Sequence, residues 1–460
     1  MRWKLPQPQG FTPYAVFKYC LGAAIVLVVL MASISNYDRH PDEANHLSAA
    51  IFYENHFFPP EIGDPAVRDS YSVWGVSYLN YHWAEYFFAG KFIFFISPLI
   101  QDPNMSARFF NVFLLCLLAS LFLYRSRESN TEFIIPCFLL ISPQVWYVFS
   151  YSNNDAFALF ASLLLAYQIA YPKSFLCEFL ESERFSPRLI GGLLFGGLVG
   201  LLSVCKPNYW VFILFAALWL LFNFLLNALT LKKYALIASI ALMVFAFRIG
   251  LDFYVNGETN FVGATYINYF FRGVETKHSK LLAYQEEIAD FEYKPSTIEN
   301  EPSNSNPTVK LRSKGTSATE VFSKWRWHTF SFESFVGVYG YMNLWASEWY
   351  YKTMFLLYLL FGFYLAAKVV VSKNRAAIKQ LTVVIFCCLL SIFLSFYLSW
   401  NYALQAQGRY IFPAIGMIGI FVYSNRKILH NTLTNVFLLV AFLLSAYSFI
   451  FIGLTRINSH

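Results

Sequence analysis

The stretch "AAIVLVVLMASISNYDRHPDEANH", residues 23–46, decides the fold class of this chain. Its first half contains no charged residue, whereas its second half brings Asp38, Arg39, Asp42 and Glu43 close together. An apolar run that ends abruptly in clustered charges is typical of a membrane helix that has reached the water boundary. The stretch therefore predicts a membrane-spanning helix that leads into a polar loop at the membrane surface.

The composition extends this prediction to the whole chain. Its 460 residues are 57% hydrophobic and 13% charged, whereas a soluble domain carries about 25% charged residues. Apolar runs of about 18 or more residues recur, and the alternating segments of about ten residues that a membrane β-barrel would need are absent. We therefore predict an all-α integral membrane protein with lipid as a partner. The net charge of +7 lies largely in short loops, so it indicates orientation and not nucleic-acid binding.

The apolar runs predict about eleven spans. They lie at about 15–35, 105–124, 132–149, 154–171, 188–204, 209–230, 234–253, 350–371, 381–399, 410–424 and 431–453. Basic residues close alternate spans, so the positive-inside rule predicts a cytoplasmic N-terminus and an outer C-terminus. Glu85 and Lys91 argue against a span at 81–100, because charges at the bilayer centre are costly, and a helix in the membrane interface is expected there.

Three regions follow from this topology. The first, 1–251, is a transmembrane module that contains the first outer loop, 36–104. The second, 252–348, is an outer-face insert whose residues 290–320 are polar and rich in Pro, Ser and Asn, which predicts a flexible or lid-like loop. The third, 349–460, contains the remaining transmembrane helices. The polar segments after alternate spans then gather on one face of the membrane.

Asp42 admits two interpretations. It precedes an expected short helix, and Asp commonly caps helices, but capping alone does not require Glu43, His40 and His46 nearby. A carboxylate at the membrane boundary can instead act as a general base on a sugar hydroxyl or hold a divalent ion. Glu43 and His46 share a helical face, which is half a metal site at most, because bundle sites take ligands from two or more helices. No cofactor is firmly implied by the sequence, and a divalent metal stays an open alternative.

Asp155, Lys206 and Arg409 also lie at span ends on the predicted outer face. Asp155 could cap the helix that follows it. Lys206 and Arg409 could snorkel to the membrane surface, or they could hold a phosphate group, as Lys and Arg commonly do. Two cations on the same face as a carboxylate pair favour the phosphate alternative.

Six short motifs resemble, in order, those of a family of bacterial membrane proteins catalogued as a domain of unknown function. That family in turn resembles the GT-C glycosyltransferases. The likeness covers roughly residues 1–425. The motifs are "PDEANH" (41–46), "SARFFN" (106–111), "SYSNNDA" (150–156), "CKPNYW" (205–210), "ESFVGVYGYMN" (333–343) and "QGRYIFP" (407–413).

This resemblance implies a GT-C-like enzyme that moves a sugar from a polyprenyl-phosphate or polyprenyl-diphosphate donor to an outer-face glycan or lipid. O-antigen or another envelope polysaccharide is the leading expectation, in the bacterial inner membrane with the site on the periplasmic face. A flippase of lipid-linked sugar and a non-catalytic assembly scaffold are the alternatives. The implied roles are Asp42 as base with Glu43 and Asp155 as further catalytic acids, Lys206, Arg409, Tyr209 and Tyr410 at the donor phosphate, and His40, His46, Asn154 and Gln407 at the acceptor or sugar.

Overall fold

The computed structural model describes residues 13–81, 84–126, 134–184, 188–224, 227–259, 279–429 and 431–459. Within these residues, seven helical stretches are long and apolar enough to cross a membrane. The prediction of an all-α, multi-pass membrane protein is thereby confirmed. The seven stretches are Ala15–Ile34, Pro103–Arg125, Asp155–Glu181, Ala228–Asn256, Glu348–Ser372, Arg375–Asn401 and Thr432–Leu454.

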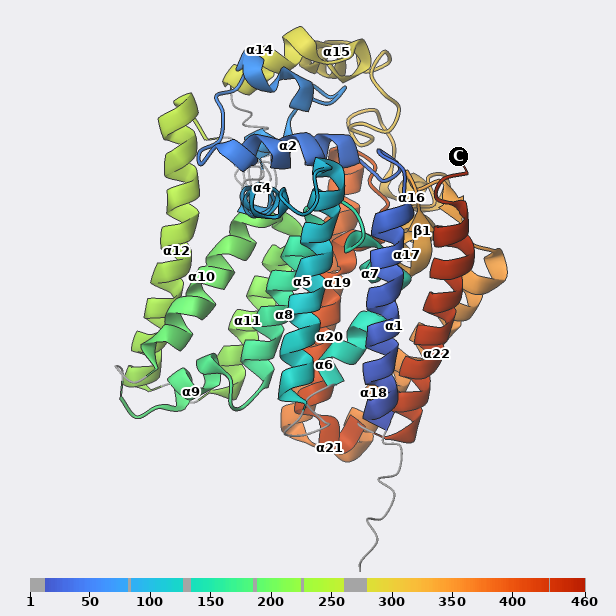
Figure 1. Cartoon of the computed structure of the whole chain (residues 1–460). Helices are drawn as coiled ribbons and strands as arrows, with labels where there is room; N and C mark the ends of the chain where they lie inside the picture. The colour runs from blue at the N-terminus through green and yellow to red at the C-terminus, as the bar shows by residue number, and fades with distance from the viewer. Residues whose placement is uncertain are drawn as a thin grey trace, which may run out of the picture.

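The long helices form one bundle, in which they run roughly along a common direction (Figure 1). Three shorter apolar helices complete it and occupy other predicted spans. The bundle consists of α1 (Pro13–Ile34), α5 (Pro103–Arg125), α8 (Asp155–Ala170), α10 (Leu189–Cys205), α11 (Trp210–Asn223), α12 (Ala228–Asn256), α18 (Glu348–Ser372), α19 (Arg375–Asn401), α20 (Pro413–Ser424) and α22 (Thr432–Ser448).

The predicted span at 132–149 is not one helix. Its described part contains α6 (Ile134–Cys137), η3 (Phe138–Leu140) and α7 (Pro143–Val148), all buried among the other helices. Pro143 lacks a backbone N–H and cannot donate the hydrogen bond that a continuous helix would need at its position. It opens α7 instead, after the Ser142 hydroxyl has accepted a bond from the Gln144 N–H at 3.2 Å.

A layer of short helices lies across one end of the bundle. It contains α2 (Glu43–Asn55), η1 (Pro65–Ser70), α3 (Tyr78–Tyr81) and α4 (Ala84–Ile96). In Figure 1, α2 lies across the vertical helices and α4 is seen almost along its axis. With 13 residues, α4 is too short to be one of the spanning helices, in line with the prediction that 81–100 does not cross. We call this the α2 end of the bundle.

The opposite end carries α9 (Phe175–Glu181) and α21 (Arg426–Leu429) (Figure 1). Arg125 at the last turn of α5 and the Arg426–Lys427 pair of α21 belong to this end. The C-terminus lies at the α2 end, whereas α1 begins at the α9 end (Figure 1). The basic span ends and the polar segments therefore separate to opposite ends of the bundle.

The insert begins after α12 and covers the α2 layer. Its residues 260–278 lie outside the described part, as do 82–83 and 132–133 of other predicted segments. Its first described elements, beyond the α2 layer in Figure 1, are α14 (Ser279–Ile288), η5 (Phe291–Tyr293) and α15 (Pro295–Asn300). The Asp290 N–H donates to the Val73 carbonyl at 3.0 Å, and the rings of Trp74 and Tyr293 lie 4.1 Å apart. These contacts fasten the insert to the first outer loop.

The following residues pair with the loop after α19. The Lys310 N–H donates to the Tyr402 carbonyl at 2.6 Å, and the Leu404 N–H donates to the Thr308 carbonyl at 2.8 Å. The predicted flexibility of 290–320 stays a prediction, while in the structure this segment packs on the loop that leads to Arg409. The insert ends with α16 (Ala318–Ser323), α17 (Trp327–Gly337) and the antiparallel pair β1 (Val338–Tyr339) and β2 (Leu344–Trp345).

Gly90 sets the close approach of α4 to α2. A Cβ atom built on Gly90 would lie 2.5 Å from the Ala50 carbonyl oxygen. We expect Gly90→Ala to lower the free energy of unfolding by about 1–3 kcal/mol, because backbone cannot move aside as a flexible side chain can. Gly250→Ala, in an open position of α12 with nothing within 4 Å, is the control. Thermal unfolding in detergent measures both variants, and equal stability would show that the two helices do not depend on this contact.

Candidate functional site

Three predicted site residues meet at the α2 end of the bundle. Lys206 Nζ donates to Asp155 Oδ1, and Arg409 Nη1 lies 3.2 Å from Asp155 Oδ2. The Asp155 side chain is 0% exposed, that of Lys206 10% and that of Arg409 14%. Snorkelling does not describe this arrangement, because both cationic heads reach a buried carboxylate instead of the surface. We call these three residues the cation cluster.

Local sequence explains how each member is presented. Asn153 Oδ1 accepts from the Ala156 N–H at 3.0 Å, so Asn153 caps the start of α8. The Asp155 carboxylate pairs with Lys206 and Arg409 instead. Lys206 adopts an extended backbone, φ −148° and ψ 120°, because the residue before a proline is restricted to that region. Pro207 then opens η4 (Pro207–Tyr209), which turns the chain into α11. Arg409 lies in η6 (Gly408–Ile411), at the start of α20.

Gln407 and Tyr410 lie on the same turn as Arg409 and contact the cations of the cluster. Gln407 Oε1 accepts from Arg409 Nε at 2.5 Å. The Tyr410 ring centre is 5.8 Å from Lys206 Nζ and 5.8 Å from Arg409 Cζ, within the range of a cation–π interaction. Tyr209, also predicted at the phosphate, is fully buried and feels the charge of Asp155. The turn from 407 to 410 thus orients the cluster, while Tyr209 backs it from inside the protein.

Glu85 adds a carboxyl group that the sequence did not assign to the site. It is 2% exposed, lies against the Cys205 thiol and the Asn154 amide, and feels the charge of Lys206. Burial raises the pKa of Glu85 to about 7. Burial also lowers the pKa of Lys206 to about 8, against the opposing effect of the Asp155 carboxylate. Both groups therefore change charge near neutral pH, and Asn154 belongs to this buried contact and not to an exposed surface.

Asp42 lies at the edge of the same region and is not a helix cap. It occupies the N-cap position of α2 with left-handed angles, φ 56° and ψ 17°, and its side chain makes no capping bond. Its Oδ2 accepts from the Tyr78 hydroxyl at 3.1 Å, and the residue is half-buried. Asp42 and Arg409 both act electrostatically on Tyr78 and on Tyr151, so both charges lie near these two rings. Left-handed backbone in a non-glycine residue is uncommon and is found often at functional sites.

Glu43 has a structural role in spite of its position beside Asp42. Arg108 Nε and Nη2 donate to its two carboxylate oxygens, each at 2.7 Å. Arg108 also donates to the carbonyls of Ala32, Ser35 and Asn36, at 3.2, 2.5 and 2.8 Å. This fully buried pair ties the end of α1 to α2 and α5. The role of Glu43 as a further catalytic acid stays a prediction, while in the structure both of its carboxylate oxygens bind Arg108.

The two histidines are core residues. His40 Nδ1 lies 2.8 Å from the Tyr147 hydroxyl and its ring stacks on Tyr151, while His46 Nδ1 lies 2.5 Å from the Tyr86 hydroxyl. They are 0% and 1% exposed. Burial lowers the pKa of His40 well below its usual value, so its ring is neutral. Their contact with an acceptor stays a prediction, while in the structure both rings lie in the protein interior. Over the described ranges, no group of three or more His, Cys, Asp or Glu could hold a metal ion.

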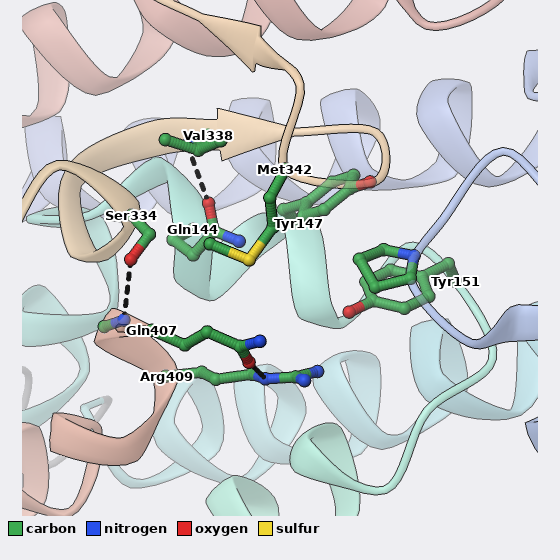
Figure 2. Close-up of a pocket in the computed structure, with 10 residues that line it drawn as sticks. Gln144, Tyr147, Tyr151, Ser334, Val338, Met342, Gln407 and Arg409 are labelled. Carbon is green, nitrogen blue, oxygen red and sulfur yellow. Dashed lines mark hydrogen bonds between the residues drawn. The ribbon is translucent and has the colours of Figure 1, made fainter. Parts of the chain in front are cut away.

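A pocket opens beside Arg409 (Figure 2). Its volume is about 10 Å³, enough for about one water molecule. Figure 2 shows Arg409 and Gln407 on one side, Tyr147 and Met342 on the other, and Tyr151 at one end. Arg409 is the charged residue of this lining, whose other members are Pro41, Gln144, Tyr147, Tyr151, Ser334, Val338, Met342, Gln407 and Gly408. The wall of the pocket is therefore largely neutral, with tyrosines and amides around one guanidinium.

Sequence reasoning missed several residues that organise this region. Tyr151 lies inside the quoted motif "SYSNNDA" and Arg108 inside "SARFFN", so both were available as signals. Tyr78 and Glu85 belong to no motif, and their place depends on how α3 and α4 pack. Comparison with protein-family models, curated proteins and solved structures finds no match for this chain.

Proposed function

We propose that this chain is a membrane glycosyltransferase of GT-C type, which moves a sugar from a polyprenyl-phosphate donor to a glycan or lipid acceptor. The observation that carries the proposal is the cation cluster, in which Asp155 holds Lys206 and Arg409. The charge of the half-buried Asp42 acts on Arg409. Transfer of a glycosyl group from a phosphate needs a cationic partner for the leaving group and a base for the acceptor. The cluster and Asp42 supply one of each.

The cation cluster would stabilise the phosphate as it leaves the sugar. The cluster itself carries one net positive charge, since two cations face the single carboxylate of Asp155. Negative charge grows on the phosphate oxygen as the bond to the sugar breaks, and preorganised donors at that oxygen stabilise the transition state. Arg409, in the pocket wall, presents a planar fork that matches two phosphate oxygens. Asp155 acts as a positioning residue that keeps both cations in place before the donor arrives.

Asp42 would act as the general base that removes the proton of the acceptor hydroxyl. An acceptor hydroxyl oxygen attacks the anomeric carbon of the sugar, and its proton passes to the Asp42 carboxylate. The carbon–oxygen bond to the phosphate breaks, and the phosphate leaves with the electron pair. Tyr78, which donates to Asp42 Oδ2, orients the carboxylate for this transfer. Each bond formed is balanced by one broken, and no redox partner is needed.

The position of the site supports this proposal over its alternatives. A transporter of lipid-linked sugar would carry charges near the bilayer midplane on discontinuous helices. Here the discontinuous segment, 134–148, contains no charged residue, and the cluster lies at the ends of α8, α10 and α20. Because the basic span ends lie at the opposite end, we place the site on the periplasmic face of a bacterial inner membrane. O-antigen or another envelope polysaccharide is the proposed acceptor.

The dependence of the transfer rate on donor concentration tests whether Lys206 and Arg409 bind the phosphate, a role that we call the phosphate clamp. We expect Arg409→Lys and Lys206→Ala each to weaken use of the donor by about 1.5–3 kcal/mol, the value of a hydrogen bond to a charged group. Lys cannot replace the planar fork of Arg, whereas it would replace a residue that only snorkels. The measurement is transfer of labelled sugar by purified protein, with the donor varied and the acceptor constant.

Arg426→Lys, at the α9 end, is the matched control and is expected to leave the curve unchanged. If Arg409→Lys changed only the acceptor curve, Arg409 would belong to the acceptor side. If both curves stayed as in the wild type, Arg409 would have no part in donor binding and the phosphate clamp would be refuted.

A further inference from the structure

The pocket beside Arg409 contains hydrogen-bonding groups that the protein itself leaves unused. Gln144 and Tyr151 line it and are 8% and 1% exposed, so both side chains are buried. Gln407 lines the pocket on the side of Arg409 (Figure 2). Buried polar groups normally have hydrogen-bond partners, because an unpaired one costs free energy. The polar atoms that remain without a partner therefore indicate which kind of ligand atom the pocket would accept.

The two amide groups of the lining are fixed so that their nitrogens remain available. Gln144 Oε1 accepts from the Val338 N–H at 3.1 Å, and Gln407 Oε1 accepts from Arg409 Nε at 2.5 Å. An amide whose carbonyl oxygen faces an N–H donor turns its NH₂ group to the other side. Figure 2 shows the Gln144 nitrogen turned away from Val338. Within the described part of the chain, no hydrogen bond engages either Nε2 atom.

Among the hydroxyl groups of the lining, that of Tyr151 is also unused. The Tyr147 hydroxyl donates to the Gly340 carbonyl at 3.3 Å, and Ser334 Oγ accepts from the Gly408 N–H at 2.7 Å. The Tyr151 hydroxyl has no such bond to the residues that the structure describes, and it lies at one end of the pocket (Figure 2). The unused groups are thus two amide nitrogens and one hydroxyl, beside the guanidinium that the proposed function assigns to the phosphate.

This set of groups suits an oxygen atom that only accepts hydrogen bonds. An amide nitrogen can only donate, and a carbonyl or carboxylate oxygen has lone pairs to receive two such donors. A sugar hydroxyl would bring a proton of its own, which the two amide nitrogens could not accept. A C–H group would leave both nitrogens unpaired. The volume of the pocket, about 10 Å³, fits one oxygen atom and not a sugar ring.

We propose that this pocket binds one carbonyl or carboxylate oxygen of the donor sugar, while the sugar ring stays at its mouth. The inference rests on the proposed function, because it takes Arg409 as a ligand of the donor phosphate. The sugar is bonded directly to that phosphate, so a substituent of the sugar lies within reach of the pocket wall that contains Arg409. The inference adds a specificity, since the donor then carries an acetamido or a carboxylate group that Gln144, Gln407 and Tyr151 recognise.

Binding of matched donors tests this inference and needs no acceptor. The probes are polyprenyl phosphate alone and polyprenyl phosphates that carry glucose, N-acetylglucosamine or glucuronic acid, each also in the galacto configuration. Calorimetry in detergent measures the Kd of each. We expect one of the substituted sugars to bind about 10-fold more tightly than the plain hexose of the same configuration, because each neutral hydrogen bond contributes about 2- to 10-fold. Preference for the acetamido sugar or for the uronic acid identifies the source of the oxygen.

Two variants test the residues of the pocket. Gln144→Glu keeps an acceptor for the Val338 N–H and removes the free NH₂ group, whereas Tyr151→Phe keeps the ring that stacks on His40 and removes the hydroxyl. Each should lower the preference, read as the ratio of two affinities in the same variant, so that a general loss of phosphate binding does not affect it. Tyr53→Phe removes a buried hydroxyl that has no partner among the described residues outside the pocket, and this control should keep the wild-type ratio.

The outcomes separate this inference from the proposed function. If polyprenyl phosphate binds but neither substituted sugar is preferred in either configuration, the pocket holds water only, and the inference is overturned while the proposed function stands. A wild-type ratio in both pocket variants would overturn it as well. If polyprenyl phosphate and all of its sugar derivatives fail to bind, the proposed function is refuted together with the inference.

Discussion

Replacement of Asp42 by asparagine is expected to lower the rate of sugar transfer by about 100- to 10,000-fold, the usual contribution of a general base. Asn tolerates the left-handed backbone of this position and can still accept the hydrogen bond from Tyr78. The fold should therefore survive while the proton acceptor is lost. Single-turnover transfer with saturating donor measures the effect directly, and unfolding in detergent confirms that the variant is intact.

Asp38→Asn is the matched control for this experiment. Asp38 has the same left-handed φ of 56° and likewise accepts from a tyrosine hydroxyl, that of Tyr341 at 2.5 Å. We expect it to retain transfer activity, because its carboxylate is turned toward Tyr341 in the insert. Equal losses of transfer activity in the two variants would show that the role of general base does not belong to Asp42 in particular. Full activity of Asp42→Asn would leave the carboxylate without a role in the chemistry.

Replacement of the adjacent acid, Glu43→Gln, is expected to act on stability instead. The change removes one charge of a buried ion pair and leaves the Arg108 guanidinium uncompensated. Breaking such a pair typically costs about 3–5 kcal/mol. Chemical denaturation in detergent measures the loss, and the transfer rate per folded molecule should equal that of the wild type.

A double variant tests whether Glu43 acts on stability through its ion pair or takes part in the reaction as a base. Replacing both partners by apolar residues, as in Glu43→Leu with Arg108→Met, removes the unpaired charge, so it should recover part of the stability lost in the single variant. A stable Glu43→Gln protein with no transfer activity would contradict this view and return the role of base to Glu43.

The sequence predicted much of the fold because its signals are local. The length and polarity of an apolar run determine whether it can cross lipid, and the alternation of basic ends assigned Asp155, Lys206 and Arg409 to one face. The broken segment at 134–148 escaped prediction for a physical reason. Its composition is as apolar as that of a span, and membrane helices tolerate proline, so Pro136 and Pro143 do not by themselves announce a break.

The partners within the site could not be predicted, since they depend on side-chain directions set by tertiary packing. Asp42 and Glu43 are neighbours of the same chemical type, and only the placement of Arg108 shows which of them is used in an ion pair. Glu85 was an argument against a span because a charge in lipid is costly. Its place beside Lys206 follows from the packing of α4 under α2, which no local pattern encodes.

The ion pairs of this protein differ in how soon a growing chain can complete them. Glu43 and Arg108 are 65 positions apart, and Asp155 and Lys206 are 51 apart, so each pair closes early in synthesis. Arg409 joins Asp155 only after most of the chain has left the ribosome. Until then the cluster is a simple Lys–Asp pair with no excess positive charge. We therefore expect the proposed affinity for a phosphate to arise only when the last helices are in place.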